Sequence, residues 1–288
     1  MWVSTDQNCL RWVETHQPQL HASLYSGLED AVGYGETDVS LHDLGHRVVL
    51  PSSYIGGPRY MNQRFQDAIA VARYYQGFDL FITFTSNTHW MEVTNALLPG
   101  QIAADRPNLM VCIFNMYKTS MIDELTKDKI FGTHLAYVHT IEFQKRGLPH
   151  MHLLLSLAPR FCPTTAEQVD SIVRATWPDP DKEPRLFKII KRCMVHGPCE
   201  QWKTNVSCMK DRKCSKGFPK PFQPETVMSR DGYPVYARPN DGRAYDVRNF
   251  IADNRWIVPY NPHLLSRYDS ISVTPMCTHH SCFDLLQA

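Results

Sequence analysis

Apolar residues recur along the chain at spacings that predict several helices. They lie three or four residues apart from Tyr60 to Tyr75 and again from Leu109 to about Lys127, a period typical of amphipathic helices. Gly77 follows the first of these segments and is a candidate C′ residue, because glycine readily adopts the left-handed conformation that ends many helices. We expect further helices over Trp90–Leu97 and Thr165–Thr176.

Polar and apolar residues alternate in a second kind of segment, which predicts β-strands. From Asp79 to Thr85 the pattern places Phe81, Thr83 and Thr85 on one face of a strand, with apolar residues on the other. A shorter strand is expected over Trp256–Val258, where Pro259 ends it.

A β-hairpin is predicted near the middle of the chain, with residues 145–149 as its connection. Side chains two residues apart on a strand share a face, so His150 and His152 point in the same direction. Antiparallel pairing across this connection places Gln144 opposite His150 and Glu142 opposite His152. If the register slipped by one residue, Glu142 and Gln144 would lie on the face opposite to the two histidines.

The four polar side chains of this hairpin suggest an open divalent-metal site. Two imidazoles facing a carboxylate and an amide match the ligands of catalytic metal centres that leave room for water or substrate. We expect His150, His152, Glu142 and Gln144 to hold Mg²⁺ or Mn²⁺. Glu142 is the preferred ligand of its pair, because a carboxylate adds charge toward a hard cation. The alternative is two half-buried strand histidines without a metal.

The order of strand, helix, helix and hairpin predicts an α+β fold. Amphipathic helices can cover one face of a small antiparallel sheet, and the other face is then open to carry polar side chains. Every predicted element up to residue 160 fits this arrangement.

Beyond Pro159 the chain changes character, and prolines break it into short segments that contain a cluster of possible metal ligands. Thiolate and imidazole are the ligands that tetrahedral zinc prefers. Nine cysteines, an odd number, and no secretory signal favour reduced thiols inside the cell over a disulfide framework. Cysteines scattered among proline turns are the alternative. The candidate ligands are Cys193, His196, Cys199, Cys208 and Cys214.

Charge is distributed unevenly although the formal net charge is only +1. Residues 182–220 contain eleven Lys or Arg and three Asp or Glu, which leaves 19 basic and 26 acidic residues elsewhere. A basic segment in a mildly acidic chain indicates contact with nucleic-acid phosphates, and a solvated basic surface is the alternative. The candidate DNA-binding residues are Arg212, Lys213, Lys216 and Lys220.

Several of these segments together resemble a known family. A His-hydrophobic-His strand beside a strand like 81–85 is similar to the HUH nucleases, which cut single-stranded DNA in rolling-circle replication and transposition. The chain resembles more closely the N-terminal replication-initiator region of Helitron transposases, also called the helicase-like domain. The resemblance covers about residues 20–273 and is carried by Leu50-Pro-Ser-Ser-Tyr-Ile-Gly-Gly-Pro-Arg-Tyr-Met61, Tyr137-Val-His-Thr-Ile-Glu-Phe-Gln-Lys-Arg-Gly-Leu-Pro-His-Met-His152, Gly232-Tyr-Pro-Val-Tyr236 and Asp253-Asn-Arg-Trp-Ile-Val-Pro-Tyr-Asn-Pro-His-Leu-Leu265.

The resemblance implies a nuclear transposon protein with an HUH-type antiparallel sheet, acting on single-stranded DNA. It also implies a zinc site made of His196, Cys199, Cys208 and Cys214, with Cys193 outside it. The expected division of the chain is an N-terminal extension (1–50), an HUH-like core (51–160), a Cys/His-rich basic insert (161–230), the C-terminal part of the domain (231–273) and a divergent tail (274–288).

The HUH reaction needs a tyrosine hydroxyl that attacks the phosphodiester and forms a 5′-phosphotyrosyl intermediate. Members of the family carry two such tyrosines on a helix that follows a strand matching Ile271–Val273, and no tyrosine follows Tyr268 here. We therefore expect a truncated chain without the nucleophile or the helicase. Tyr260 and Tyr268 are the nearest substitutes for the nucleophilic tyrosines. Two other functions stay open: noncatalytic nucleic-acid binding, and metal-dependent hydrolysis by activated water.

Overall fold

A computed structural model describes residues 2–19, 49–144, 147–199, 205–229 and 233–275. The chain forms two compact units, residues 1–71 and 72–288. The first unit contains α1 (Trp2–Thr15) and most of α3 (Pro58–Tyr74). Gln17 ties the end of α1 to the segment before α3, because its side-chain amide bonds both the N–H and the C=O of Val49 at 2.8 and 3.1 Å.

The predicted amphipathic helix is confirmed as α3, but the residue that ends it differs. Gln76, not Gly77, takes the left-handed conformation at C′, with φ 60°. The Gly77 N–H then donates to the Ala72 carbonyl at 2.8 Å, which satisfies one of the last carbonyls of the helix. Gly77 is therefore the C″ residue of this helix and not the C′ residue.

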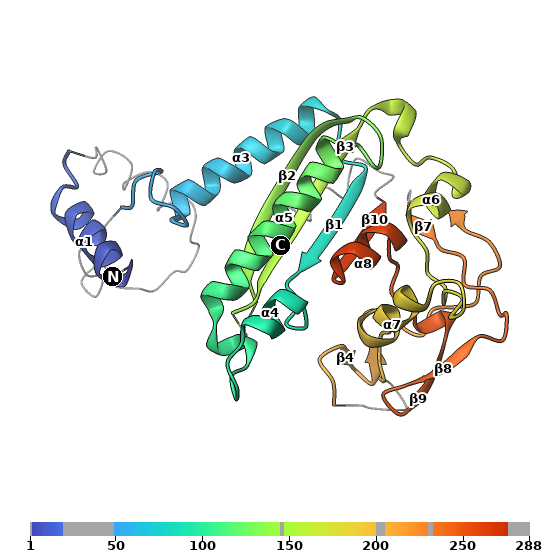
Figure 1. Ribbon diagram of the computed structural model, residues 1–288. Helices are drawn as coiled ribbons and strands as arrows, with labels where there is room; N and C mark the ends of the chain where they lie inside the picture. The colour runs from blue at the N-terminus through green and yellow to red at the C-terminus, as the bar shows by residue number, and fades with distance from the viewer. Residues whose placement is uncertain (1, 20–48, 145–146, 200–204, 230–232, 276–288) are drawn as a thin grey trace. The chain divides into compact units, whose positions relative to one another are not determined.

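A four-stranded antiparallel sheet organises the second unit, and its strand order is β10-β1-β3-β2 (Figure 1). The strands are β1 (Leu80–Thr85), β2 (His134–Phe143), β3 (Pro149–Leu157) and β10 (Ile271–Pro275). The predicted neighbourhood of β1 and the histidine-bearing strand is confirmed, since Thr83 pairs with His152 and Thr85 with His150. The strand expected at 271–273 also exists and forms the edge beside β1.

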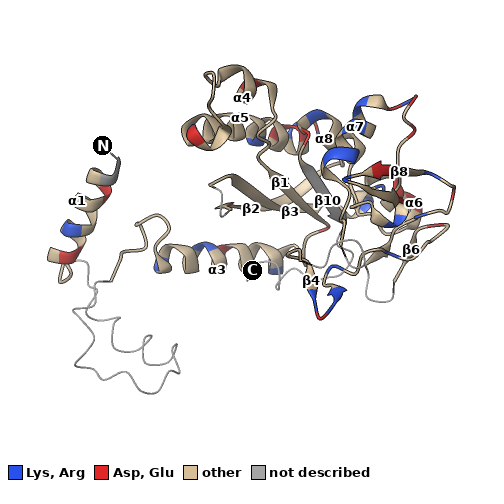
Figure 2. Ribbon diagram, turned by 90° about the horizontal axis from the view of Figure 1, so that it is seen from below, with Lys and Arg blue, Asp and Glu red and all other residues tan. Residues whose placement is uncertain are grey.

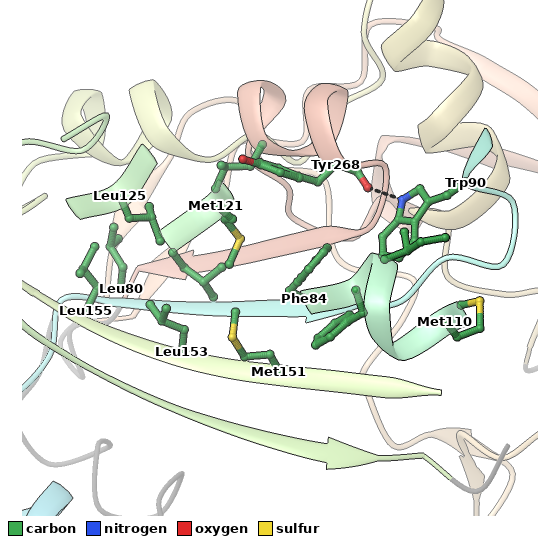
Figure 3. Close-up of a cluster of buried hydrophobic side chains, with 14 of the residues drawn as sticks. Leu80, Phe84, Trp90, Met110, Met121, Leu125, Met151, Leu153, Leu155 and Tyr268 are labelled. Carbon is green, nitrogen blue, oxygen red and sulfur yellow. Dashed lines mark hydrogen bonds between the residues drawn. The ribbon is translucent and has the colours of Figure 1, made fainter. Parts of the chain in front are cut away.

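Helices cover one face of this sheet, as the apolar pattern predicts. They are α4 (Met91–Ala96), α5 (Pro107–Thr126) and α8 (Pro262–Tyr268). The apolar stripe of α5 packs on Leu80, Ile82 and Phe84 of β1 and on Met151, Leu153 and Leu155 of β3 (Figure 3). The opposite face of the same two strands carries the alternate residues, which include His150 and His152. The fold is therefore α+β, with a polar site on the face away from α5.

The chain between β3 and α8 forms short elements instead of a continuous layer. Its helices are α6 (Ala166–Ile172) and α7 (Pro184–Cys193), and its hairpins are β4 (Met209–Lys210) with β5 (Lys213–Cys214), β6 (Val227–Met228) with β7 (Pro234–Val235), and β8 (Ala244–Val247) with β9 (Phe250–Asp253). Single helical turns span Ala103–Asp105, Pro159–Phe161 and Asn254–Trp256.

Two sequence predictions fail in this region. The helix expected over 165–176 ends at Ile172, because the chain then extends so that Arg174 can pair with Tyr260. The strand expected over Trp256–Val258 is wrong: a helical turn ends at Trp256, and Ile257 makes only an isolated bridge to Val195.

These short elements share a second hydrophobic core. Trp177 and the apolar face of α7 pack there with residues of β8 and β9 and with the chain leading to α8. Two cysteines, Cys199 and Cys214, are buried in the same core. Among the described residues no helix is both long and apolar enough to cross a membrane.

Candidate metal centres

The β2–β3 hairpin is tighter than predicted, and this changes which residues face the histidines. Glu142 lies opposite His150 and Thr140 opposite His152, so the predicted register is wrong by two residues. The reason is that the turn closes inside residues 144–148. Gly147, at φ 73°, donates its N–H to the Gln144 carbonyl at 2.7 Å, and strand pairing resumes at Pro149.

A shift of two residues leaves every side chain on its original face. Glu142 therefore still shares the face of His150 and His152, and its Oε1 lies 3.0 Å from His152 Nε2. Gln144, in contrast, lies beyond the end of β2, is exposed, and uses its backbone to close the turn. The structure thus places Glu142, and not Gln144, on the strand beside the histidines.

Glu142, His150 and His152 are close enough to share one ion. One ligand atom from each residue can be chosen so that all three lie within 4.8 Å of one another. The two imidazole rings are 4.5 Å apart between centroids and nearly perpendicular, at 82°. Three protein ligands with an exposed carboxylate on one side match a site that keeps further positions for water or substrate.

Strand β1 holds the two imidazoles in place. The Thr85 hydroxyl lies 2.7 Å from His150 Nδ1, and the Thr83 hydroxyl lies 3.4 Å from His152 Nδ1. When Nδ1–H donates to a threonine oxygen, Nε2 keeps the lone pair that a metal needs. Phe81 stacks on the His152 ring with centroids 5.2 Å apart.

Sequence reasoning grouped Phe81, Thr83 and Thr85 on one strand face but assigned them no role. The signal was available, since alternate polar residues on a strand next to the histidines must lie on the histidine face. Burial, together with the charge of His152, lowers the pKa of His150, and Glu142 only partly opposes this. The resulting neutral imidazole is the form that binds metal ions.

The second group consists of His196, Cys199, Cys208 and Cys214. Cys208 directly precedes β4 and Cys214 is the last residue of β5. The two turn residues of this hairpin, Asp211 and Arg212, have φ values of 49° and 63°, as in a tight two-residue turn. The His196 N–H donates to the Trp256 carbonyl at 2.9 Å, which fixes the backbone of the histidine against the helical turn Asn254–Trp256.

One ligand atom from each of these four residues lies within 4.8 Å of the other three, and His196 Nε2 is 3.2 Å from Cys214 Sγ. Ligands about 2.3 Å from a tetrahedral zinc ion would be about 3.8 Å apart, so the spacing suits that metal. Cys193 is outside the group, because it lies on α7 with its thiol against the Ile189 carbonyl at 3.1 Å.

The electrostatic environment of the thiols also fits a cation. Burial and the neighbouring Cys214 raise the pKa of Cys199 to about 12, so its thiolate needs a nearby positive charge. Burial acts in the same direction on Cys214, but the backbone N–H groups of Phe218 and Lys216 outweigh it and the pKa of Cys214 is lowered. These amides are placed to stabilise a thiolate.

The basic residues of the segment do not form a single patch. Lys213 lies on β5 and Arg212 in the β4–β5 turn, both exposed, and Lys216 and Lys220 follow them. Four other cations lie on α7, and Figure 2 shows the blue segments of α7 and of the hairpin at β4 apart from each other. Two of the four predicted DNA-binding residues therefore belong to the β4–β5 hairpin, and the other two lie in the segment that follows it.

Neither tyrosine candidate presents its hydroxyl to the histidines. Tyr260 is fully buried and donates to the Thr176 carbonyl at 3.0 Å. Tyr268 packs on the α5 face of the sheet, where its ring contacts Phe84 (Figure 3). Its hydroxyl donates to Glu124 Oε1 at 2.9 Å. Burial raises the pKa of both phenols. The sheet separates Tyr268 from the polar face.

Comparison with known families assigns the N-terminal half of the chain. Residues 1–155 match the family model described as the Helitron helicase-like domain at the N-terminus. A search of curated proteins gives no match. The matched residues include Glu142, His150 and His152, and they end before the Cys/His group. The match covers more than half of the 288 residues, and the chain therefore belongs to the family that carries the Helitron helicase-like domain at its N-terminus.

Proposed function

We propose that this protein is a transposon-encoded module that binds single-stranded DNA through a divalent-metal site of the HUH nickase and strand-transferase type. The observation that carries the proposal is the shared face of Glu142, His150 and His152, with both imidazoles oriented by threonines of β1. The family match includes all three residues. Such a protein would work in the nucleus, where its DNA is.

Each residue of the site has a separate task in this proposal. His150, His152 and Glu142 would hold Mg²⁺ or Mn²⁺, and the ion would supply polarisation of a phosphodiester oxygen. Thr83 and Thr85 keep the two Nε2 atoms turned toward the ion. Exposure of Glu142 leaves the approach to this face open to a strand of DNA.

The Cys/His group would have a structural task. We propose that His196, Cys199, Cys208 and Cys214 hold one zinc ion, because three thiols and an imidazole within 4.8 Å match its preferred ligands. The ion would fix the β4–β5 hairpin and so place Lys213, Lys216, Lys220 and Arg212 along the DNA backbone.

A polypeptide of this sequence would bind DNA without attacking it through tyrosine. The hydroxyls of both tyrosine candidates are engaged away from the histidines, since Tyr260 donates to the Thr176 carbonyl and Tyr268 donates to Glu124. A metal-polarised phosphate still needs a positioned nucleophile, so formation of a phosphotyrosyl bond would fail.

Hydrolysis by activated water is a second candidate, favoured by the same geometry. In the described part of the chain no tyrosine hydroxyl is bonded to Glu142, His150 or His152, whereas the Glu142 carboxylate lies 3.0 Å from His152. A carboxylate in that position can accept a proton from water. Strand cleavage that depends on Mn²⁺ and persists when Tyr260 and Tyr268 are both replaced by Phe would favour this candidate.

Binding to labelled single strands and duplexes, measured by fluorescence anisotropy, tests the proposal. We expect tighter binding to single strands and a loss of affinity with rising salt, with a logarithmic slope of about −2 to −3 if three or four phosphates are contacted. Mn²⁺ should strengthen binding to the wild-type protein but not to His150→Ala. Equal affinity for duplex and single strand, or binding insensitive to salt, would contradict the proposal.

A further inference from the structure

A pocket of about 550 Å³ lies beside the Cys/His group, and neither metal centre accounts for it. One wall comes from the segment after β5, with Lys216, Phe218 and Lys220, and the other from β7 and the residues that follow it, with Val235, Tyr236 and Arg238. Pockets that bind small molecules have volumes of about 300–1,000 Å³, so this one could hold a nucleotide-sized group.

Three cations line the pocket, and none of the described residues in its lining is a carboxylate. Arg238 is only 4% exposed, and it donates to the carbonyl oxygens of Asn254 and Ile257 at 2.6 and 2.8 Å. Lys220 Nζ donates to the Lys216 carbonyl at 2.9 Å. Within the described ranges none of these cations forms a salt bridge. Carbonyl groups fix the positions of Arg238 and Lys220 but do not neutralise them, so the pocket favours an anion.

Burial supports the same conclusion. It lowers the pKa of Arg238 to about 10. It also lowers the pKa of Lys220, and the positive charge of Arg238 lowers that pKa further. An anion placed between them would relieve the cost of holding two partly buried positive charges.

Aromatic and apolar side chains form the rest of the wall. The Phe218 ring stacks on His196 with centroids 4.3 Å apart, and Lys220 Nζ lies 5.3 Å from the Phe218 centroid. Tyr236 is half-buried, and Val235, 43% exposed, lies at the opening. A ligand that matches both parts of the pocket combines a negative group with a flat apolar one, as a nucleotide does.

We propose that this pocket holds one nucleotide of a bound single strand, its phosphate among the three cations Lys216, Lys220 and Arg238 and its base against Val235 and Tyr236. The inference rests on the proposed binding of single-stranded DNA and adds the place where a base is held. Acidic peptides share the charge but lack the flat base, so they fit the apolar wall less well.

The pocket is built on the Cys/His group, which makes the two interdependent. His196 belongs to both, and the Gly217 N–H donates to the Cys214 carbonyl at 2.8 Å in the turn that leads to Phe218. Gly217 has φ +62°, and a Cβ there would lie 3.3 Å from Lys220 Nζ. Removal of zinc should therefore loosen the pocket wall and weaken binding at the pocket.

The test uses three probes with the full chain: labelled dT12, the same backbone without bases, and poly-glutamate as competitor. We expect wild type to bind dT12 about tenfold more tightly than the abasic strand, since stacking of one base is worth about that much. Lys220→Gln and Val235→Glu should each weaken dT12 binding about tenfold. Lys210→Gln removes one exposed charge of the same hairpin outside the pocket and should cost about twofold or less.

Zinc content and the melting temperature establish that each variant is folded. If a variant does not fold, Lys216→Gln takes its place, because Lys216 is exposed. Equal binding of dT12 and abasic strand, or equal effects of Lys210→Gln and Lys220→Gln, would refute the proposal that the pocket holds a nucleotide. Either result would leave the proposed binding of single-stranded DNA unaffected. Competition by poly-glutamate as strong as by dT12 would assign the pocket to acidic peptides instead. Wild type that binds no single strand would overturn the proposed function as well.

Discussion

Two threonine hydroxyls determine how the histidines of β3 are presented. Thr85 and Thr83 occupy the positions of β1 that pair with His150 and His152, and each hydroxyl lies next to the Nδ1 atom of its histidine. The contacts differ in length, at 2.7 Å for Thr85 and 3.4 Å for Thr83. The shorter contact should constrain its ring more strongly.

Replacement of these threonines tests their orienting role. Thr85→Val keeps the shape of the side chain and removes the hydroxyl, so we expect Mn²⁺ affinity to fall about tenfold, as for other partners of metal-bound histidines. Thr83→Val is the matched control and should cost about threefold or less, because its contact is already long. Calorimetric titration with Mn²⁺ measures both, and a larger effect of Thr83→Val would refute the assignment.

The carboxylate of the site gives a second prediction. Glu142→Gln keeps the size of the side chain and removes its charge, so Mn²⁺ affinity should fall about tenfold or more. Gln144→Glu adds a carboxylate beyond the end of β2 and should leave the affinity within about twofold. A gain in affinity with Gln144→Glu would show that the register with Gln144 opposite His150 describes the metal-bound protein.

Strands and helices with a clear period could be predicted from the sequence. Residues 80–85 alternate in burial as the pattern of polar and apolar residues indicates, and the stripe of α5 is buried where it was expected. Helix α7 is not predicted by the sequence pattern although Leu186, Ile189 and Ile190 have helical spacing, because the surrounding prolines indicate only short segments.

The hairpin register shows what the sequence alone could not supply. Both registers place Glu142 on the histidine face, and hydrophobic pattern cannot distinguish a slip of two residues. The choice depends on Gly147 and on the bond between the Gln144 N–H and the Leu148 carbonyl, a turn geometry that residue types did not specify. Spacing likewise leaves five candidate zinc ligands. The family resemblance implies that Cys193 is outside the group, and the fold places it there.

The short elements of the second core give an element-scale prediction about zinc. Cys199 and Cys214 are buried in that core, so Cys208→Ser should abolish binding of about one zinc per chain and melt the β4–β5 hairpin. Chelation of the wild type should do the same and shift the fluorescence of Trp177 and Trp256 to the red, since both are buried there.

Cys193→Ser is the matched control, because Cys193 lies on α7 outside the group. It should retain zinc and melt within a few degrees of the wild type. Zinc measured by atomic absorption separates the outcomes: loss of the ion in Cys193→Ser, or its retention in Cys208→Ser, would refute the ligand assignment.

At the scale of the second unit, segments far apart in the sequence complete one sheet. The residues matched by the family model end at Leu155, yet β10 at 271–275 pairs along β1 and closes that edge. The Trp90 indole N–H donates to the Tyr268 carbonyl at 2.9 Å, joining the segment before α4 to α8. The Cys/His-rich region therefore lies between two segments of the chain that both contribute to the sheet with the histidine face.

One reaction tests the central claim that this chain holds single-stranded DNA at a metal site without attacking it through tyrosine. The chain is incubated with Mn²⁺ and labelled single-stranded DNA, and equal samples are run on native and denaturing gels. We predict a shifted complex on the native gel at low salt and no labelled protein on the denaturing gel. Absence of the complex, or a denaturation-resistant adduct that disappears with Tyr268→Phe, would contradict the account.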